Sequence, residues 1–127
     1  MKTLIVDDSN TMRRIIKNKL LEMGMTDGEM YEAEDGIEAL KVLKNTSIKL
    51  ILLDWNMPKL NGFELLKQLK ADDTYKSIPV IMVTTEGGKA EVVSAIKAGV
   101  CDYIVKPFDV ETIQRKVELA KDKFNIK

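Results

Sequence analysis

The sequence predicts an α/β protein in which a parallel β-sheet carries helices on both faces. Five short, mostly apolar runs alternate with longer stretches whose apolar residues follow the period of a helix. Four of the runs are almost continuously apolar, which is typical of strands buried on both faces of a parallel sheet. The length of 127 residues, 45% of them hydrophobic, suits one domain with one substantial core.

The expected strands are the five apolar runs, taken in chain order. They read "TLIVDD" (3–8), "EMYEAED" (29–35), "KLILLD" (49–54), "PVIMVTT" (79–85) and "DYIVKP" (102–107). The second run mixes polar residues throughout its length, so we expect it at an edge of the sheet.

The expected helices lie between these runs and after the last one. The apolar positions of the first helix are Met12, Ile16, Leu20 and Met23, and those of the last are Val110, Ile113, Val117, Ala120 and Phe124. The three other helices are expected at 35–45, 61–71 and 88–98. Suitable N-caps are Ser9, Asp35, Asn61 and Asp109. Suitable C-terminal stops are Gly24 and Gly99.

The resulting order is five successive strand–helix units. Such alternation implies a parallel sheet with right-handed crossovers. Five units of this kind can adopt the flavodoxin-like strand order 2-1-3-4-5, which is the fold that we expect here. Ligands of open α/β sheets bind beyond the carboxyl ends of the strands, here at the switch point between the first and third strands.

Composition excludes several functional classes. Lys and Arg together number 20, as do Asp and Glu, so the chain lacks the basic surplus of a nucleic-acid-binding protein. It has no His for acid–base catalysis or metal binding, and its one cysteine, Cys101, can form neither a disulfide framework nor a zinc site. No apolar run has the length of a signal-peptide core or a membrane span. We therefore expect a cytoplasmic protein that binds neither nucleic acid nor membrane.

Polar residues follow the apolar runs at one edge of the expected sheet. Asp7 and Asp8 end the first strand, Asp54 ends the third, Thr84 ends the fourth and Lys106 ends the fifth. Each alone is ordinarily a cap, a turn residue or a solvated side chain, or, for Thr84, a β-branched strand residue. Their coincidence at the carboxyl ends of four strands favours a functional site.

The chemistry of this set suits phosphoryl transfer. Clustered carboxylates repel one another unless a cation holds them or some are protonated, and an oxygen-only donor set favours Mg²⁺. A carboxylate can itself act as a nucleophile and form an aspartyl phosphate. Lys106 can neutralise the phosphate as a point charge.

The motifs "VDDS", "LLDWNMPKLNG", "VTT" and "VKPF" resemble those of the receiver domains of bacterial two-component response regulators, and the resemblance runs from residue 3 to about residue 124. It implies that Asp54 is the phosphoacceptor. It also implies that Asp8, Asp54 and the backbone carbonyl of Asn56 bind Mg²⁺, with Asp7 acting through water. Thr84 and Lys106 take the roles of switch hydroxyl and phosphate-binding lysine, and the Lys106–Pro107 bond is expected to be cis.

The chain is expected to be a single receiver domain over residues 1–127, monomeric and without an output domain. "DWNMP", "VTTEGGKAEV" and Tyr103 are most similar to chemotaxis receivers of the CheY group. This resemblance implies phosphorylation by a CheA-like sensor histidine kinase, after which the receiver binds the flagellar motor switch. It assigns a second switch role to Tyr103 and the tuning of phosphate hydrolysis to Asn56 and Glu86. The partner face is implied to include Gly87, Lys89, Val92, Tyr103 and Lys116.

Other functions stay open at this point. A phosphorelay intermediate would pass its phosphoryl group to a second His protein, and the sequence does not reveal whether a separate phosphatase acts. An aspartyl-phosphate hydrolase of the haloacid dehalogenase type needs an acid where the chain has Asn56, which cannot transfer protons. A flavin mononucleotide module would place its phosphate against the carboxylates of "DDSNT". Catalysis is expected to be limited to the chain's own phosphorylation and dephosphorylation.

Overall fold

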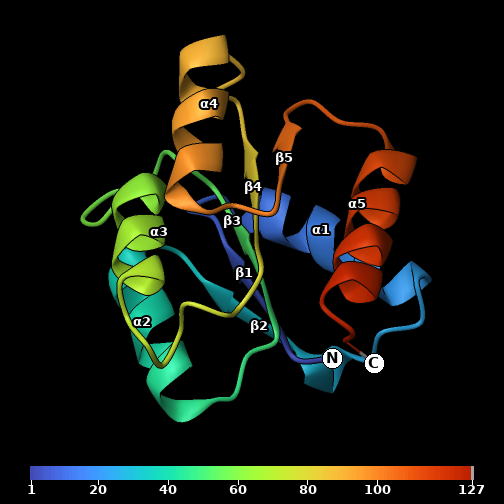
Figure 1. Cartoon of the computed structure of the whole chain (residues 1–127). Coiled ribbons are helices and arrows are strands. Elements are labelled where there is room, and N and C mark those ends of the chain that lie inside the picture. The colour runs from blue at the N-terminus through green and yellow to red at the C-terminus, as the bar shows by residue number, and fades with distance from the viewer. Residues whose placement is uncertain (127) are drawn as a thin grey trace.

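The computed structural model describes residues 1–126, except for the side chain of Val110. Its centre is a five-stranded parallel sheet in the order β2-β1-β3-β4-β5, as expected for the flavodoxin-like fold (Figure 1). The strands are β1 (Thr3–Val6), β2 (Met30–Ala33), β3 (Leu50–Leu53), β4 (Val80–Thr84) and β5 (Asp102–Val105). The helices are α1 (Asn10–Glu22), the short 3₁₀ helix η1 (Asp27–Glu29), α2 (Gly36–Asn45), α3 (Gly62–Lys70), α4 (Lys89–Ala98) and α5 (Val110–Lys123).

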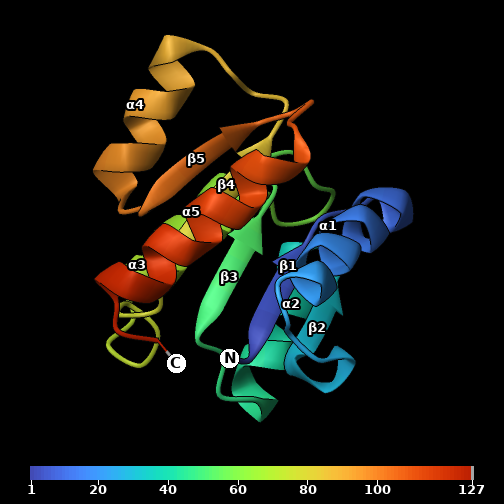
Figure 2. The same cartoon turned by 90° about the vertical axis from the view of Figure 1, so that its right-hand side faces the viewer.

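The helices form two layers around the sheet. Helices α2, α3 and α4 lie on one face, and α1 and α5 lie on the other (Figures 1 and 2). Successive side chains of a strand point to opposite faces, so β1 sends Leu4 and Val6 into the first layer and Ile5 into the second. Both core clusters are therefore built from the same strands, which explains why those strands read as continuous apolar runs.

The predicted N-caps and the two glycine stops are confirmed. Ser9, Asp35, Asn61 and Asp109 each cap a helix by accepting the backbone N–H of the residue three positions later. Helix α4 stops at Gly99, whose φ of 110° lies in the left-handed region that favours glycine. Gly24, with a φ of 94°, follows the end of α1.

Two sequence-based expectations are wrong. The fifth run is not buried on both faces, because β5 forms the second edge of the sheet and leaves Val105 43% exposed. Phe124 does not extend the buried stripe of the last helix. Helix α5 ends at Lys123, and the Phe124 side chain is 39% exposed. Val105 and Phe124 are both apolar, but neither is covered by another helix or strand of the described chain.

The sheet register sets up the carboxyl edge. Val6 of β1 lies opposite Leu53 of β3, so the residues that follow these two strands emerge side by side. The Lys106–Pro107 peptide bond just after β5 is cis, as the resemblance implies. No helix in the described part of the chain is long and apolar enough to span a membrane.

Candidate functional site

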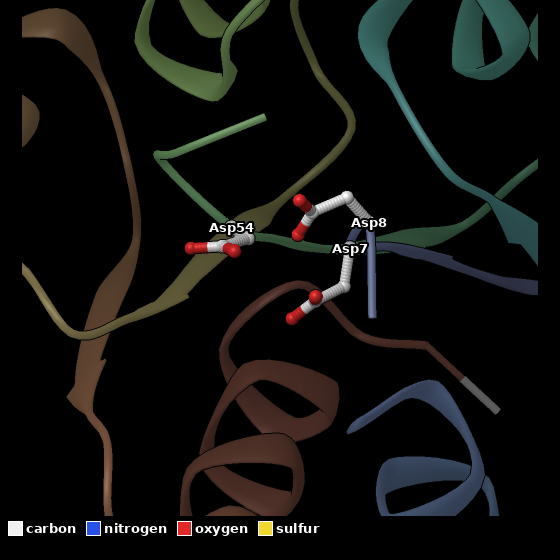
Figure 3. Close-up of side chains that lie close together, drawn as sticks. All are labelled: Asp7, Asp8 and Asp54. Atoms are coloured by element: carbon white, nitrogen blue, oxygen red, sulfur yellow. The ribbon is translucent and has the colours of Figure 1, made fainter. Parts of the chain in front are cut away.

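Three carboxylates gather where β1 and β3 end. Asp7, Asp8 and Asp54 each offer an oxygen atom, and these oxygens lie within 4.8 Å of one another. Figure 3 shows the three side chains gathered around a common space, with Asp7 and Asp8 coming from the end of β1 and Asp54 from the end of β3. Asp7 is 1% exposed and Asp54 is 6% exposed, whereas Asp8 is open to solvent.

Asp7 is held at each of its polar groups. One carboxylate oxygen accepts the backbone N–H of Ser9 at 2.9 Å, and the other accepts the Lys106 ammonium at 2.6 Å. Its own N–H donates to the carbonyl of Ala33, and its carbonyl accepts the Arg13 guanidinium. The hydrogen bonds within the described chain thus leave Asp7 little freedom to turn.

Asp54 is a buried carboxylate whose negative charge is only partly compensated by its neighbours. Its nearest cation, the Lys106 ammonium, is 3.5 Å away, and the backbone N–H of Asn56 donates to it at 3.4 Å. Burial raises the pKa of the Asp54 carboxyl, and the charge of Asp7 adds to this rise, while Lys106 and the nearby Thr84 hydroxyl oppose it. A further cation beside Asp54 would relieve this unfavourable charge.

The start of α3 fixes the backbone of Asp54. Gly62 approaches so closely that a Cβ added to it would lie 1.9 Å from the carbonyl oxygen of Asp54. The N–H of Gly62 also donates to the carbonyl of Trp55 at 2.8 Å. Trp55 in turn stacks on Phe63, with ring centroids 4.7 Å apart. The chain after Asp54 therefore folds back on itself and is held there.

A hydrogen-bonded network links the site to β5 through Glu86. The Glu86 side chain accepts the Asn56 amide at 2.7 Å, and its backbone N–H donates to the Thr84 hydroxyl at 3.3 Å. The carbonyl of Glu86 accepts the hydroxyl of Tyr103. Burial raises the pKa of Tyr103 to about 12, with the Glu86 charge as the next cause, so this hydroxyl remains a donor at neutral pH.

The residues expected on the partner face lie around β5, with α4 on one side and α5 on the other (Figure 2). They are the loop residue Gly87, Lys89 and Val92 of α4, Tyr103 of β5 and Lys116 of α5. Lys116 forms an ion pair with Asp102 at 2.6 Å, so its charge is partly neutralised. Ile96, Val105 and Leu119 expose apolar surface on the same three elements.

The structure brings together the site residues predicted from the strand ends and adds two that the sequence reasoning missed. Asp7, Asp8, Asp54, Thr84 and Lys106 meet at one edge of the sheet. The missed residues are Arg13 and Gly62. Arg13 precedes Ile16 by three positions and Leu20 by seven, so it lies on the buried stripe of α1, but a count of apolar residues passes over it.

The donor set can hold a hard divalent cation. Its carboxylate oxygens are the ligands that such ions prefer, and no sulfur or imidazole ligand belongs to the cluster. Asp8 is exposed and its side chain makes no hydrogen bond within the described chain, so it can turn toward an ion. The same space, bordered by Lys106, also suits an oxyanion held against the ion.

Comparison with known proteins agrees with this geometry. Residues 3–118 match the response regulator receiver domain family. The chain is 56% identical over 119 residues to a Campylobacter jejuni protein named "Chemotaxis protein CheY homolog", covering 93% of this chain and 90% of that protein. It is 54% identical to "Chemotaxis protein CheY1" of Helicobacter pylori, covering 94% and 96%. The structure of the Vibrio cholerae chemotaxis protein CheY4 matches with a TM-score of 0.83 at 32% identity, covering 93% of this chain and 96% of that one. This chain therefore belongs to the response regulator receiver domain family.

Proposed function

We propose that this receiver domain is a signalling switch that accepts a phosphoryl group on Asp54. The observation that carries this proposal is the position of Asp54. It is a buried carboxylate at the switch point of the sheet, beside two further aspartates and 3.5 Å from the Lys106 ammonium. A nucleophile, a place for a cation and a fixed positive charge for the phosphate are the parts that phosphoryl transfer to a carboxylate requires.

Mg²⁺ is the proposed cofactor. Asp8, Asp54 and the backbone carbonyl of Asn56 would hold it directly, and Asp7 would hold it through water, because its carboxylate is already engaged by Ser9 and Lys106. When bound, Mg²⁺ neutralises charge on the transferring phosphoryl group and on the carboxylates around it. The exposed position of Asp8 gives the ion a route of entry from solvent.

The proposed reaction is transfer from a phosphohistidine of a sensor kinase. A carboxylate oxygen of Asp54 attacks the phosphorus, the phosphorus–nitrogen bond breaks, and the imidazole nitrogen keeps the electron pair. Lys106 then moves from its 2.6 Å contact with Asp7 toward the phosphoryl oxygens. A charge-assisted bond of this kind contributes about 1.5–3 kcal/mol, which makes Lys106 a strong anchor for the product.

The switch is proposed to run through Thr84, Glu86 and Tyr103. The Thr84 hydroxyl would donate to a phosphoryl oxygen on Asp54. Because the N–H of Glu86 donates to that hydroxyl, and the carbonyl of Glu86 accepts Tyr103, a shift of Thr84 changes what holds the tyrosine. Tyr103 belongs to the edge strand β5, so its position alters the surface that a partner meets.

Asn56 and Glu86 are proposed to tune hydrolysis of the aspartyl phosphate. They lie two positions after Asp54 and Thr84, and their side chains share a 2.7 Å hydrogen bond. Because Asn56 is exposed two positions after Asp54 and is bonded to Glu86, this pair would meet water that approaches the phosphoryl group from solvent. Substituting Asn56 with Ala should change the decay rate of the phosphorylated protein, and an unchanged rate would remove this assignment.

The proposed partners follow from the chemotaxis names of the relatives. We infer a CheA-like histidine kinase as donor and the flagellar motor switch as target of the phosphorylated form. The target would bind the face formed by α4, β5 and α5, whose elements expose the apolar side chains of Ile96, Val105 and Leu119 and the charged side chain of Lys89. A central apolar patch with charged residues near it is the usual anatomy of a binding surface.

Trp55, the chain's one tryptophan, reports on the site because it directly follows Asp54. Its fluorescence is followed while Mg²⁺ and then a small phosphodonor such as acetyl phosphate are added, with Asp54→Asn as the matched control. We expect a change on Mg²⁺ and a second, reversible change that the variant lacks. Identical responses to the phosphodonor in both proteins would contradict phosphorylation at Asp54.

A further inference from the structure

Arg13 is a buried charged residue that the proposed mechanism leaves unused; the other such residue in the described chain, Asp35, caps α2. The Arg13 side chain is only 10% exposed. The chain has as many acidic as basic residues, so its overall charge balance does not require this charge to be buried. A guanidinium is rarely buried unless it is paired and its donors are satisfied. Helix α1 directs Arg13 back past the helix start to the end of β1, where the site begins.

Arg13 forms hydrogen bonds to the segment after β1, to strand β2 and to the first residue of its own helix. Its Nη1 donates to the backbone carbonyl of Asp7, its Nε donates at 3.0 Å to Glu32 of the edge strand β2, and its Nη2 donates to Asn10 at the start of α1. The guanidinium is planar and presents its donors in a fixed fork, so it holds these acceptors in one relative arrangement. A lysine has one rotatable ammonium and no such fork.

The bond to Asp7 reaches the proposed metal site through the backbone. Its acceptor is the carbonyl of Asp7, the group that leads into the peptide bond with Asp8. The carboxylate of Asp7 is held separately by Ser9 and Lys106, and Arg13 holds the carbonyl that leads from Asp7 to Asp8. Groups one step behind the ligands of a metal orient those ligands and affect its affinity strongly.

We propose that Arg13 is a positioning residue for the metal site, orienting the Asp7–Asp8 peptide so that Asp8 presents its carboxylate to a divalent cation. This proposal rests on the proposed function of the carboxylate cluster. The proposal predicts the direction in which Mg²⁺ affinity changes when Arg13 is replaced. The positive charge of Arg13 repels a cation, so removing that charge would tighten Mg²⁺ binding if charge alone mattered. Removing a positioning residue weakens binding instead, by about 10- to 100-fold.

The test compares Mg²⁺ dissociation constants of the full chain, measured by calorimetry and by Trp55 fluorescence. Arg13→Met removes the charge and the fork, Arg13→Lys keeps the charge alone, and Arg14→Met removes an equal charge from the adjacent, exposed position. We expect at least about a 10-fold weaker affinity in Arg13→Met, an intermediate loss in Arg13→Lys and wild-type affinity in Arg14→Met.

The outcomes separate the alternatives. Unchanged or tighter binding in Arg13→Met overturns the proposal, as does an equal loss in Arg14→Met. If Arg13→Met does not fold, Arg13→Lys decides: a several-fold loss supports positioning by the fork, and wild-type affinity overturns it. Absence of Mg²⁺ binding by the wild-type chain would instead refute the proposed function of the cluster, and the role of Arg13 with it.

Discussion

Replacing Gly62 with Ala sets two effects of opposite sign against each other. Gly62 begins α3, and a helical glycine costs about 0.5–1 kcal/mol relative to alanine, so helix propensity alone predicts stabilisation. The added Cβ would lie 1.9 Å from the carbonyl oxygen of Asp54 and 2.8 Å from its carbonyl carbon. Both neighbouring atoms are backbone, which cannot rotate away as a flexible side chain can.

The size of the clash decides which effect wins. The added Cβ and the carbonyl oxygen of Asp54 would have to move apart by about 1.5 Å. Their distance would then rise from 1.9 Å to 3.4 Å, where ordinary van der Waals contact begins. Forcing extra volume into a packed interior costs about 1–3 kcal/mol, and a clash with backbone belongs at the upper end of that range. We therefore expect a net loss of about 2 kcal/mol in the free energy of unfolding, after the helix term is subtracted.

The same shift should damage function, because the displaced atom belongs to the proposed acceptor. A misplacement of about 1 Å can cost 100-fold in rate, so phosphorylation of Gly62→Ala by acetyl phosphate should slow by about that factor. Urea unfolding measures the stability and Trp55 fluorescence measures the rate.

The matched control is Gly28→Ala in η1, where an added Cβ has no neighbour within 4 Å. It should keep the wild-type rate and be neutral or more stable by about 0.4–1 kcal/mol. If Gly62→Ala were as stable as the wild type and phosphorylated at the same rate, the close approach of α3 to Asp54 would be wrong.

Three further predictions concern stability, each measured by urea unfolding in Mg²⁺-free buffer. Because burial raises the pKa of Asp54 above its ordinary 3.8, its ionised form destabilises the fold as pH rises through that raised pKa. Asp54→Asn should therefore be more stable than wild type at pH 7, and an advantage that did not shrink toward pH 4 would contradict the burial argument. The pKa of Asp35 is shifted in the opposite direction. The backbone N–H of Glu38 lowers its pKa, so its contribution is present above pH 3.8 and disappears as pH falls through the lowered value. Asp35→Ala should lose about 1 kcal/mol at neutral pH and less in acid, whereas a pH-independent loss would point to packing alone. Leu66→Ala should lose about 2–5 kcal/mol, because the side chain is fully buried in the core beneath α3; a loss below 1 kcal/mol would mean that this core collapses around the gap.

Several parts of the site were predictable because direction is shared by all strands of a parallel sheet. Once the apolar runs are identified as parallel strands, the residues that follow them must meet at one edge. This reasoning predicts that Asp7, Asp54 and Lys106 lie together, and in the structure Lys106 is within ion-pair distance of both aspartates. Cap residues such as Asn61 were equally predictable from the sequence, because a cap forms its hydrogen bond with its own helix a few residues away.

Contacts between distant elements were not predictable in this way. The spacing of apolar residues describes a helix or strand relative to its own axis, and it says nothing of what the opposite element presents. It could not show that Arg13 turns back to the carbonyl of Asp7, or that Gly62 touches the carbonyl of Asp54. Apolar residue type also did not reveal that Val105 of β5 and Phe124 after α5 stay exposed, because it does not show which other elements cover a side chain.

The sequence by itself determined the fold class, the order of the elements and the residues at the carboxyl edge, because these depend on local periodicity and on the shared direction of parallel strands. Only the tertiary structure decided how that edge is held. Segments far apart in the chain meet there: Lys106 bonds to Asp7, and the start of α3 approaches Asp54. Glu86 joins Asn56 to Tyr103 in the same way. Their geometry arises from the packing of whole elements against one another, which local pattern does not encode.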